Sequence, residues 1–238
     1  MTKSGEVKVL GWVSPYVLRV QIALNIKNVT YTYLDQNLKT KGELLLKSNP
    51  VYKKVPVLIH GDKSISESRI IVEYIDETWS SGPSILPSDP YERATARFWA
   101  TYLDDKWGPA TKAIEAVVIA GEGKEAKNAA VDKVHEILVL IEGAFKQCSK
   151  GKPFFGGGQI GYLDIALGGF LGWLRFRELI HEIKLLDPAI TPELVKWADR
   201  FCRHPAVSGV MQTTELLANS EYGSGLFAKV RAAASTLN

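Results

Sequence analysis

The chain has 238 residues, of which 46% are hydrophobic and 23% charged, enough for one large domain or two modest ones. These fractions exclude long disorder and a fibrous repeat. Because 29 basic side chains stand against 26 acidic ones, the net charge is only +3, and no clustered basic stripe of the kind that binds nucleic acid is present.

The cysteines and histidines form no pattern that holds a metal ion. Cys148 and Cys202 lie far apart and make no CxxC pair or disulfide framework. No HExxH or other ligand pair occurs, so we expect no zinc site. The first residues are polar and no apolar run approaches the roughly 20 residues of a membrane span. We therefore expect a reduced, cytoplasmic protein with no membrane partner.

Up to residue 79 the hydrophobic periodicity switches repeatedly between that of a strand and that of a helix. The order is β-α-β, then a connecting segment, then β-β-α. The expected elements are a strand at 7–12, a helix at 15–26, a strand at 30–34, a connection around 44–47, strands at 57–59 and 64–65 joined by a turn at 60–63, and a helix at 67–79.

A Ser/Gly/Pro-rich stretch then separates two regions. We predict a first domain at 1–80, a linker at 81–90 and an all-helical domain at 91–238. Residues 1–80 hold 11 basic and 8 acidic side chains, so they carry the whole net charge, which favours an anionic ligand there. Helix breaks are expected at 121–123, 151–158, 188–192 and around 220–225.

Ser14 and Pro15 follow the first strand and occupy the N-cap and first position of the next helix. A structural cap is the ordinary interpretation. The functional alternative is a hydroxyl that, with the helix dipole and free amides, donates to an anion above the strand ends. No base adjoins Ser14 and no GxSxG surrounds it, so a nucleophilic serine is the weaker hypothesis.

Two further local features map to the same end of the expected sheet. Val55-Pro56 precedes a strand and suits a rigid, cis turn, in which the backbone of Val55 would pair with an extended peptide. Ser66-Glu67-Ser68 opens the next helix; it is either a simple cap or an arrangement in which Glu67 binds an amine and Ser68 binds a carboxylate. Together with Ser14 they indicate one binding site.

These motifs resemble those of cytosolic glutathione transferases, most closely the plant tau class. The resemblance covers nearly all of the chain and includes SPYVLRVQIAL, NPVYKKVPVLIHGDKSISES, LPSDPYERATARFWATYLDD and GYLDIAL, in order and at family spacing. It implies an α+β fold, with a thioredoxin-like βαβ-ββα domain followed by an all-α helical bundle.

The resemblance also implies glutathione as co-substrate, without metal or nucleotide. Ser14 would stabilise its thiolate, Lys41 and Lys54 would bind the glycyl carboxylate, and Val55 would pair with the cysteinyl unit. Glu67 and Ser68 would hold the γ-glutamyl group. The serine at position 14 disfavours the thiol-redox chemistry of relatives with cysteine there.

The implied reaction is attack of the thiolate on hydrophobic electrophiles, with glutathione peroxidase activity as a side reaction. The alternative function is a ligandin-like, non-catalytic carrier of flavonoids, auxins or other amphiphiles. Gly108 and Lys112 stand where close relatives often carry tyrosine and arginine, which implies a more open pocket. The residues expected to form the electrophile site, or else to pack in the core, are Trp12, Tyr16, Trp107, Gly108, Lys112, Trp173, Leu226, Phe227 and Val230.

Three other expectations concern structure and assembly. The formal GxGxxG match at 156–161 lacks a βαβ setting, and Gly161 is better interpreted as an N-cap with Asp164 reaching back and Ile160 packed on Ile165. Asn28 suits a left-handed position after the first helix. The family implies a homodimer, for which the expected interface residues are Glu77, Arg93 and Arg97.

Overall fold

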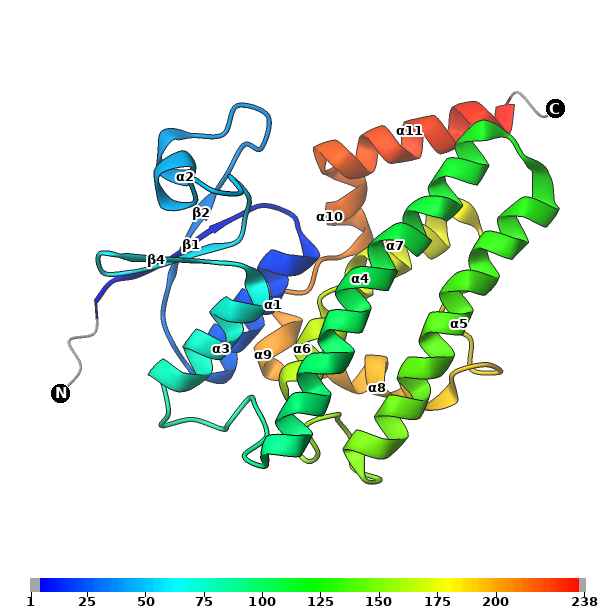
Figure 1. Cartoon of the computed structure of the whole chain (residues 1–238). Helices are drawn as coiled ribbons and strands as arrows, with labels where there is room; N and C mark the ends of the chain where they lie inside the picture. Colours follow the sequence, from blue (N-terminus) through cyan, green and yellow to red (C-terminus); the bar gives the residue numbers. More distant parts are fainter. Residues whose placement is uncertain (1–4, 236–238) are drawn as a thin grey trace.

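The computed structural model describes residues 5–235, so the outermost ends of the two predicted domains, 1–4 and 236–238, lie outside the described residues. Figure 1 shows a small sheet-containing part beside a larger helical part. The elements of the first part are β1 (Val7–Gly11), α1 (Pro15–Ile26), β2 (Thr32–Asp35), α2 (Glu43–Ser48), β3 (Val57–His60), β4 (Lys63–Ser66) and α3 (Ser68–Thr78).

The four strands form one mixed sheet in the order β2-β1-β3-β4. β1 runs parallel to β2 and antiparallel to β3, and Val9 lies between Tyr33 and Leu58 in this register. α1 and α3 pack together on one side of the sheet, while α2 lies on the other (Figure 1). The expected β-α-β and β-β-α order is therefore confirmed.

Two details differ from the expectation. β2 begins at Thr32 rather than residue 30, and the connection around residues 44–47 is a short helix, α2. This helix buries only Leu45, which packs with Leu10 and Val57 of the sheet. One apolar anchor is too little to produce a helical period in the sequence.

The second part is helical throughout its regular elements: α4 (Pro90–Ala120), α5 (Gly123–Ser149), α6 (Tyr162–Gly168), α7 (Leu171–His181), α8 (Pro192–Arg203), α9 (Pro205–Ser208), α10 (Thr214–Asn219) and α11 (Glu221–Ser235). The break expected around 220–225 is wrong beyond Ser220, because α11 continues through Gly223 and Gly225. A Cβ on Gly223 would lie 1.8 Å from the carbonyl oxygen of Leu217, so this glycine serves close helix packing instead of ending the helix.

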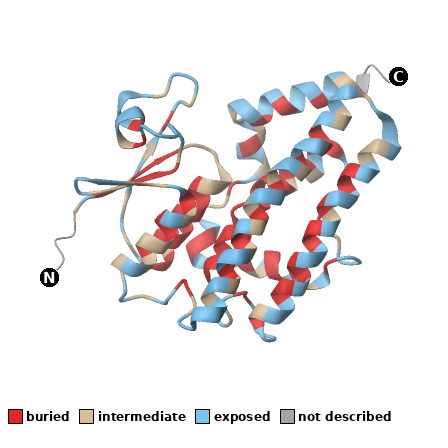
Figure 2. Cartoon of the chain, viewed as in Figure 1, coloured by how far each residue is buried: buried red, intermediate tan, exposed pale blue. Residues whose placement is uncertain are grey.

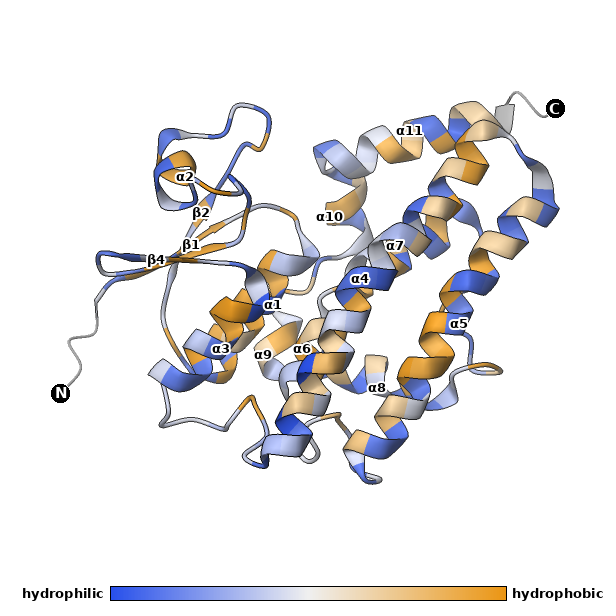
Figure 3. Cartoon of the chain, in the orientation of Figure 1, coloured by the Kyte–Doolittle hydropathy of each residue, from blue (hydrophilic) through white to orange (hydrophobic). Residues whose placement is uncertain are grey.

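The core joins the two parts. Buried residues gather in α1 and on the inner sides of α4 and α5 (Figure 2), and apolar positions concentrate in β1 and α1 (Figure 3). One cluster contains Val9 and Val17 from the first part together with Trp107 and Phe201 from the second. α1 therefore packs against both parts. Within residues 5–235, no helix is long and apolar enough to cross a membrane.

The segment before α6 is held by a buried carboxylate. Asp164 accepts the backbone N–H of Gly161 at 2.8 Å, as expected, and also those of Phe155 and Gly156 and the indole N–H of Trp197. Burial raises the pKa of Asp164 to about 6, although these donors act to lower it. At neutral pH a carboxylate thus fixes the glycine-rich loop onto α6 and α8.

Candidate active site

Ser14 lies between the end of β1 and the start of α1, as its N-cap residue. Its hydroxyl oxygen accepts the backbone N–H of Tyr16 over 3.3 Å. Because that contact uses a lone pair of the oxygen, the hydroxyl proton remains free to donate. The carbonyl of Ser14 accepts the side-chain amide of Gln212 at 3.1 Å, so the helical part helps to position this segment.

Glu67 and Ser68 lie at the start of α3. Glu67 is an exposed cap residue with φ of 73°, a left-handed conformation that is uncommon for a side chain without a special constraint. Ser68 is buried, and its hydroxyl oxygen accepts a guanidinium N–H of Arg19 at 3.4 Å. Strained backbone at a helix start, next to a buried hydroxyl, is typical of a ligand-binding site.

The turn that contains Val55 is as expected, because the Val55–Pro56 peptide bond is cis. Val55 is half-buried and Lys54 is exposed, and the carbonyl of Lys54 accepts the side-chain amide of Asn49 at 2.9 Å. Lys41 is half-buried and has a left-handed φ of 46°. Lys41 lies between β2 and α2, and Lys54 lies shortly before β3, so both lysines are on segments that border the sheet.

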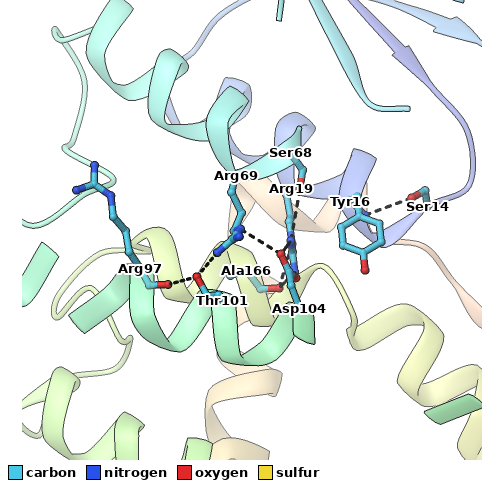
Figure 4. A network of polar contacts seen from close by, with 9 residues as sticks. All are labelled: Ser14, Tyr16, Arg19, Ser68, Arg69, Arg97, Thr101, Asp104 and Ala166. Carbon is cyan, nitrogen blue, oxygen red and sulfur yellow. Dashed lines mark hydrogen bonds and ion pairs between the residues drawn. The ribbon is translucent and has the colours of Figure 1, made fainter. Parts of the chain in front are cut away.

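A buried arginine that the sequence analysis did not single out lies between these features. Arg19, on α1, donates two hydrogen bonds to the carboxylate of Asp104, at 2.6 and 3.1 Å, and two to the carbonyl of Ala166. Its guanidinium also stacks on the Tyr16 ring at 4.9 Å (Figure 4). Only 1% of Arg19 is exposed, so this charge is fully compensated inside the molecule.

The network extends outward along α4. Arg69 forms an ion pair with Asp104 at 3.2 Å and a hydrogen bond to Thr101, whose hydroxyl donates to the carbonyl of Arg97 (Figure 4). Arg97 also pairs through two bonds with Glu73 of α3. A continuous polar chain thus ties α3 to α4.

Tyr16, whose backbone N–H bonds the Ser14 hydroxyl oxygen, is affected by the charged residues of this network. Burial raises the pKa of the Tyr16 phenol; the charge of Arg19 lowers it, and those of Asp104 and Glu67 raise it further. The charge on Glu67 therefore acts on the first turn of α1. Tyr16 thus links Ser14, which accepts its backbone N–H, to the charges of Arg19, Asp104 and Glu67.

A cleft of about 570 Å³ opens between the two parts of the molecule, and Trp12, two residues before Ser14, lines it. An ion pair between Lys39 of the segment after β2 and Glu221 of α11 crosses it. Its walls come from both parts, as expected of a site between domains. The lining residues are Trp12, Asp35, Gln36, Asn37, Leu38, Lys39, Glu115, Ile119, Glu221, Tyr222, Gly225, Leu226 and Lys229.

Glu115 is an acidic residue in this wall, but its carboxylate is already bonded. Arg177 of α7 donates to one oxygen at 2.9 Å and the Tyr222 hydroxyl donates to the other at 3.3 Å. Burial and the charge of Glu115 both raise the pKa of Tyr222, so the phenol stays protonated. This three-residue cluster gives the cleft a neutral, hydrogen-bonded wall instead of a free base.

The predicted electrophile-site residues occupy different environments. Trp12 and Leu226 line the cleft. Trp107 is buried and stacks on Phe170 with ring centroids 5.6 Å apart, and Trp173 belongs to a second apolar cluster. Tyr16 lies beside Arg19 as described, and four other predicted residues lie outside the cleft lining: Gly108, Lys112, Phe227 and Val230.

Two residues that help to position the site, Arg19 and Gln212, were not identified from the sequence. Arg19 is the one charged residue of α1 and lies within the apolar run from Val17 to Val20, a pattern that indicates a buried, paired charge. Gln212 has no comparable local signal, because it is 198 positions from the carbonyl that it holds.

Comparisons with known proteins agree with this geometry. The model of the glutathione S-transferase N-terminal domain matches residues 5–77, and that of the C-terminal domain matches residues 98–205. Glutathione S-transferase U17 of Arabidopsis thaliana is 56% identical over 231 residues, which are 96% of this chain and 99% of the relative.

Solved structures give the same result. A tau-class glutathione S-transferase from mango, Mangifera indica, is 60% identical, with a TM-score of 0.86 over 93% of this chain and 98% of that one. A rice glutathione transferase in complex with glutathione is 33% identical, with a TM-score of 0.78 over 90% of this chain and 95% of that one. The chain therefore belongs to the glutathione S-transferase family, and its relatives place it in the tau class.

Proposed function

We propose that the protein transfers glutathione to hydrophobic electrophiles, with Ser14 as the residue that stabilises the glutathione thiolate. The sulfur attacks an electrophilic carbon and forms a C–S bond. With a chloronitrobenzene the C–Cl bond breaks and chloride leaves; the proton of the thiol goes to solvent. The cleft between the two parts would hold the electrophile, with Trp12, two residues before Ser14, and Leu226 among its apolar contacts.

The remaining residues would bind the peptide part of glutathione. Glu67, exposed at the start of α3, would hold the γ-glutamyl amine. Ser68 keeps its hydroxyl proton for the γ-glutamyl carboxylate, since Arg19 uses only the oxygen. The backbone of Val55 would pair with the cysteinyl unit. Lys41 and Lys54 would together bind the glycyl carboxylate.

The observation that carries the proposal is the free hydroxyl proton of Ser14 at the N-terminus of α1. A thiol of pKa about 8.5 is only a few per cent ionised at pH 7. Lowering that pKa by roughly two units requires about 2.7 kcal/mol of selective thiolate stabilisation. One hydrogen bond to a charged group together with a helix N-terminus supplies stabilisation of this order.

The test compares Ser14→Ala with Ser14→Thr. Both should fold, and threonine keeps a hydroxyl at the N-cap. In Ser14→Ala we expect the pKa in the pH profile of kcat/KM with 1-chloro-2,4-dinitrobenzene to rise by about one to two units, with turnover at pH 6.5 falling about ten- to a hundredfold. Ser14→Thr should show a smaller rise in this pKa and a smaller loss of turnover. An unchanged profile and turnover in Ser14→Ala would exclude the assigned role.

The same thiolate also supports peroxidase chemistry. Attack on a hydroperoxide oxygen breaks the O–O bond and releases an alcohol, and a second glutathione then yields glutathione disulfide and water. A carrier of amphiphiles is the alternative function, because the cleft combines apolar side chains (Trp12, Leu38, Ile119 and Leu226) with polar ones. Binding of a flavonoid without any conjugation above the uncatalysed thiol reaction would favour the carrier.

We further propose that the protein forms a homodimer through the outer faces of α3 and α4. Tyr91 and Phe98, seven positions apart on α4, are 74% and 61% exposed, and Ile70 on α3 is 58% exposed. Exposed apolar side chains on adjoining helices are typical of an interface. Of the polar residues expected there, Glu77 is exposed, while Arg93 and Arg97 bond within their own chain.

A further inference from the structure

A second cavity, of about 280 Å³, lies at the end of the helical part where the turn between α4 and α5 meets the ends of α7 and α11. Figure 1 shows α11 reaching this turn at the upper right. The apolar part of its wall consists of Val117, Val118, Ile180 and Val230. Most of the cavity surface in contact with a ligand would thus be aliphatic.

One wall residue is a buried histidine without hydrogen-bond partners. His181 is 3% exposed, and neither ring nitrogen has a partner among the described residues. Buried polar atoms in proteins are rarely left unpaired, because each costs the free energy of its lost hydration. The pKa of His181 is lowered to about 4 by burial and by the charges of Arg177 and Lys127. The ring is therefore neutral and offers one N–H donor.

Positive charge surrounds the same cavity. Lys127 lines it, and its ammonium group donates to the carbonyl of His181 at 2.6 Å, which fixes the ammonium at the wall. Lys124 also lines it, is exposed and has no partner in the described part of the chain. Opposite charge comes from Glu182, an exposed residue at the rim. Among the lining residues, two cations against one carboxylate leave a net charge of +1, while Glu122 and Glu125 at the start of α5 lie outside the lining.

The N-terminus of α5 contributes to the same wall through Gly123 and Lys124. This helix has 27 residues, and no side chain caps its N-terminus. Within residues 5–235, the backbone N–H groups of Gly123 and Lys124 find no acceptor. The free N–H groups and the helix dipole favour an anion at this point.

We infer that this cavity binds a small amphiphilic monocarboxylate, with its carboxylate between the α5 N-terminus, Lys124, Lys127 and His181, and its apolar body against the aliphatic wall. A single negative charge matches the net charge of the site, and Glu182 at the rim opposes more highly charged ligands. The volume of about 280 Å³ suits a small ligand. Octanoate, a monocarboxylate with a short aliphatic chain, is a suitable probe.

The cavity is distinct from the cleft that Trp12 lines, because the two share no lining residue. One apolar cluster, which includes Trp173 and Phe176, lies between them: its member Leu226 lines the cleft, and its member Val230 lines the cavity. The same helix α7 supplies Arg177 to Glu115 in the cleft wall and, one turn later, His181 to the cavity. Binding of a carboxylate in this cavity does not require glutathione.

The test follows the histidine ring signals by NMR during titration of the whole protein with octanoate, and measures affinity by calorimetry. The His181 signals, identified by their loss in His181→Gln, should shift, while those of His60, His135 and His204 stay in place. Lys124→Gln should weaken octanoate binding about three- to tenfold. The matched control Lys63→Gln removes one exposed charge on β4 and should leave the affinity unchanged.

Three results would overturn the inference. The first is the absence of any His181 shift at millimolar octanoate. The second is an equal response to octan-1-ol, which lacks the charge. The third is loss of the response when S-hexylglutathione fills the cleft, because octanoate would then occupy that cleft. A retained response with the cleft filled supports a separate site.

Discussion

His181 makes the stability of the helical part depend on pH in a specific range. Burial and the charges of Arg177 and Lys127 lower the pKa of its ring from 6.5 to about 4. In the unfolded chain the ring takes up a proton below pH 6.5, whereas in the folded protein it stays neutral until about pH 4. Acid therefore favours the unfolded state between these two values.

The magnitude follows from the two pKa values. The difference between 6.5 and about 4 in the pKa of His181 corresponds to a limit of about 3 kcal/mol. By proton linkage, the loss of unfolding free energy from this one ring is about 1 kcal/mol at pH 5.5 and about 2–3 kcal/mol at pH 4.5, relative to pH 7.5. With a urea m-value near 3 kcal/mol/M, the loss at pH 4.5 lowers the midpoint by somewhat less than about 1 M.

The assay is urea unfolding at pH 7.5, 6.5, 5.5 and 4.5, followed by tryptophan fluorescence. His181→Gln cannot be protonated, so its stability should fall less with acid than that of the wild type, by the amounts above. The absolute stability of the variant at pH 7.5 does not enter the comparison. The control is His135→Gln, since the ring of His135 already bonds the carbonyl of Lys184. Parallel pH curves for the wild type and His181→Gln would refute the reasoning.

Two further predictions concern groups that position the loops and the site. Trp197→Phe removes the 2.7 Å indole donor to Asp164, so we expect unfolding free energy to fall by about 2 kcal/mol, measured by urea at pH 7.5, with an unchanged KM for glutathione. Gly172→Ala places a Cβ 2.6 Å from the carbonyl oxygen of Gln212, which should shift the amide that holds Ser14. We expect kcat to fall about three- to tenfold in steady-state assays, with a smaller change in the KM for glutathione.

Matched variants separate these effects from general damage. Gly143→Ala adds a methyl group on α5 where no atom lies within 4 Å, so its kcat should equal that of the wild type. Trp12→Phe makes the same substitution as Trp197→Phe, but at a tryptophan that lines the cleft instead of one in the core. It should alter the KM for the electrophile. If Gly172→Ala kept full turnover, Gln212 would have no part in positioning Ser14.

Local chemistry explains what could be predicted from the sequence. A serine–proline pair after an apolar strand predicts an N-cap, and Ser14 occupies it. The left-handed position predicted for Asn28 is confirmed by its φ of 53°, and the bond from Gly161 to Asp164 spans three residues. Each of these features depends on neighbours in the chain, so a short motif contains the whole signal.

Features that depend on distant parts of the chain could not be predicted in this way. The partners of Arg19 lie 85 and 147 positions away, and no local pattern specifies them. Glycines were misleading for a related reason. Gly223 was expected to interrupt a helix, but the close approach of Leu217 explains it, and that approach exists only after folding. The buried bonding of Glu115 is likewise set by α7 and α11.

The bonds of Arg19 have a consequence for exchanging domains between relatives. One guanidinium from the sheet-containing part holds Asp104 and the Ala166 carbonyl of the helical part. In a chimera that joins the sheet-containing part of this protein to the helical part of a relative, that helical part must therefore supply a carboxylate at the position of Asp104. Without it, the graft would leave an unpaired charge in the interior, at a cost of about 3–5 kcal/mol. The residue pair thus restricts which halves recombination can join.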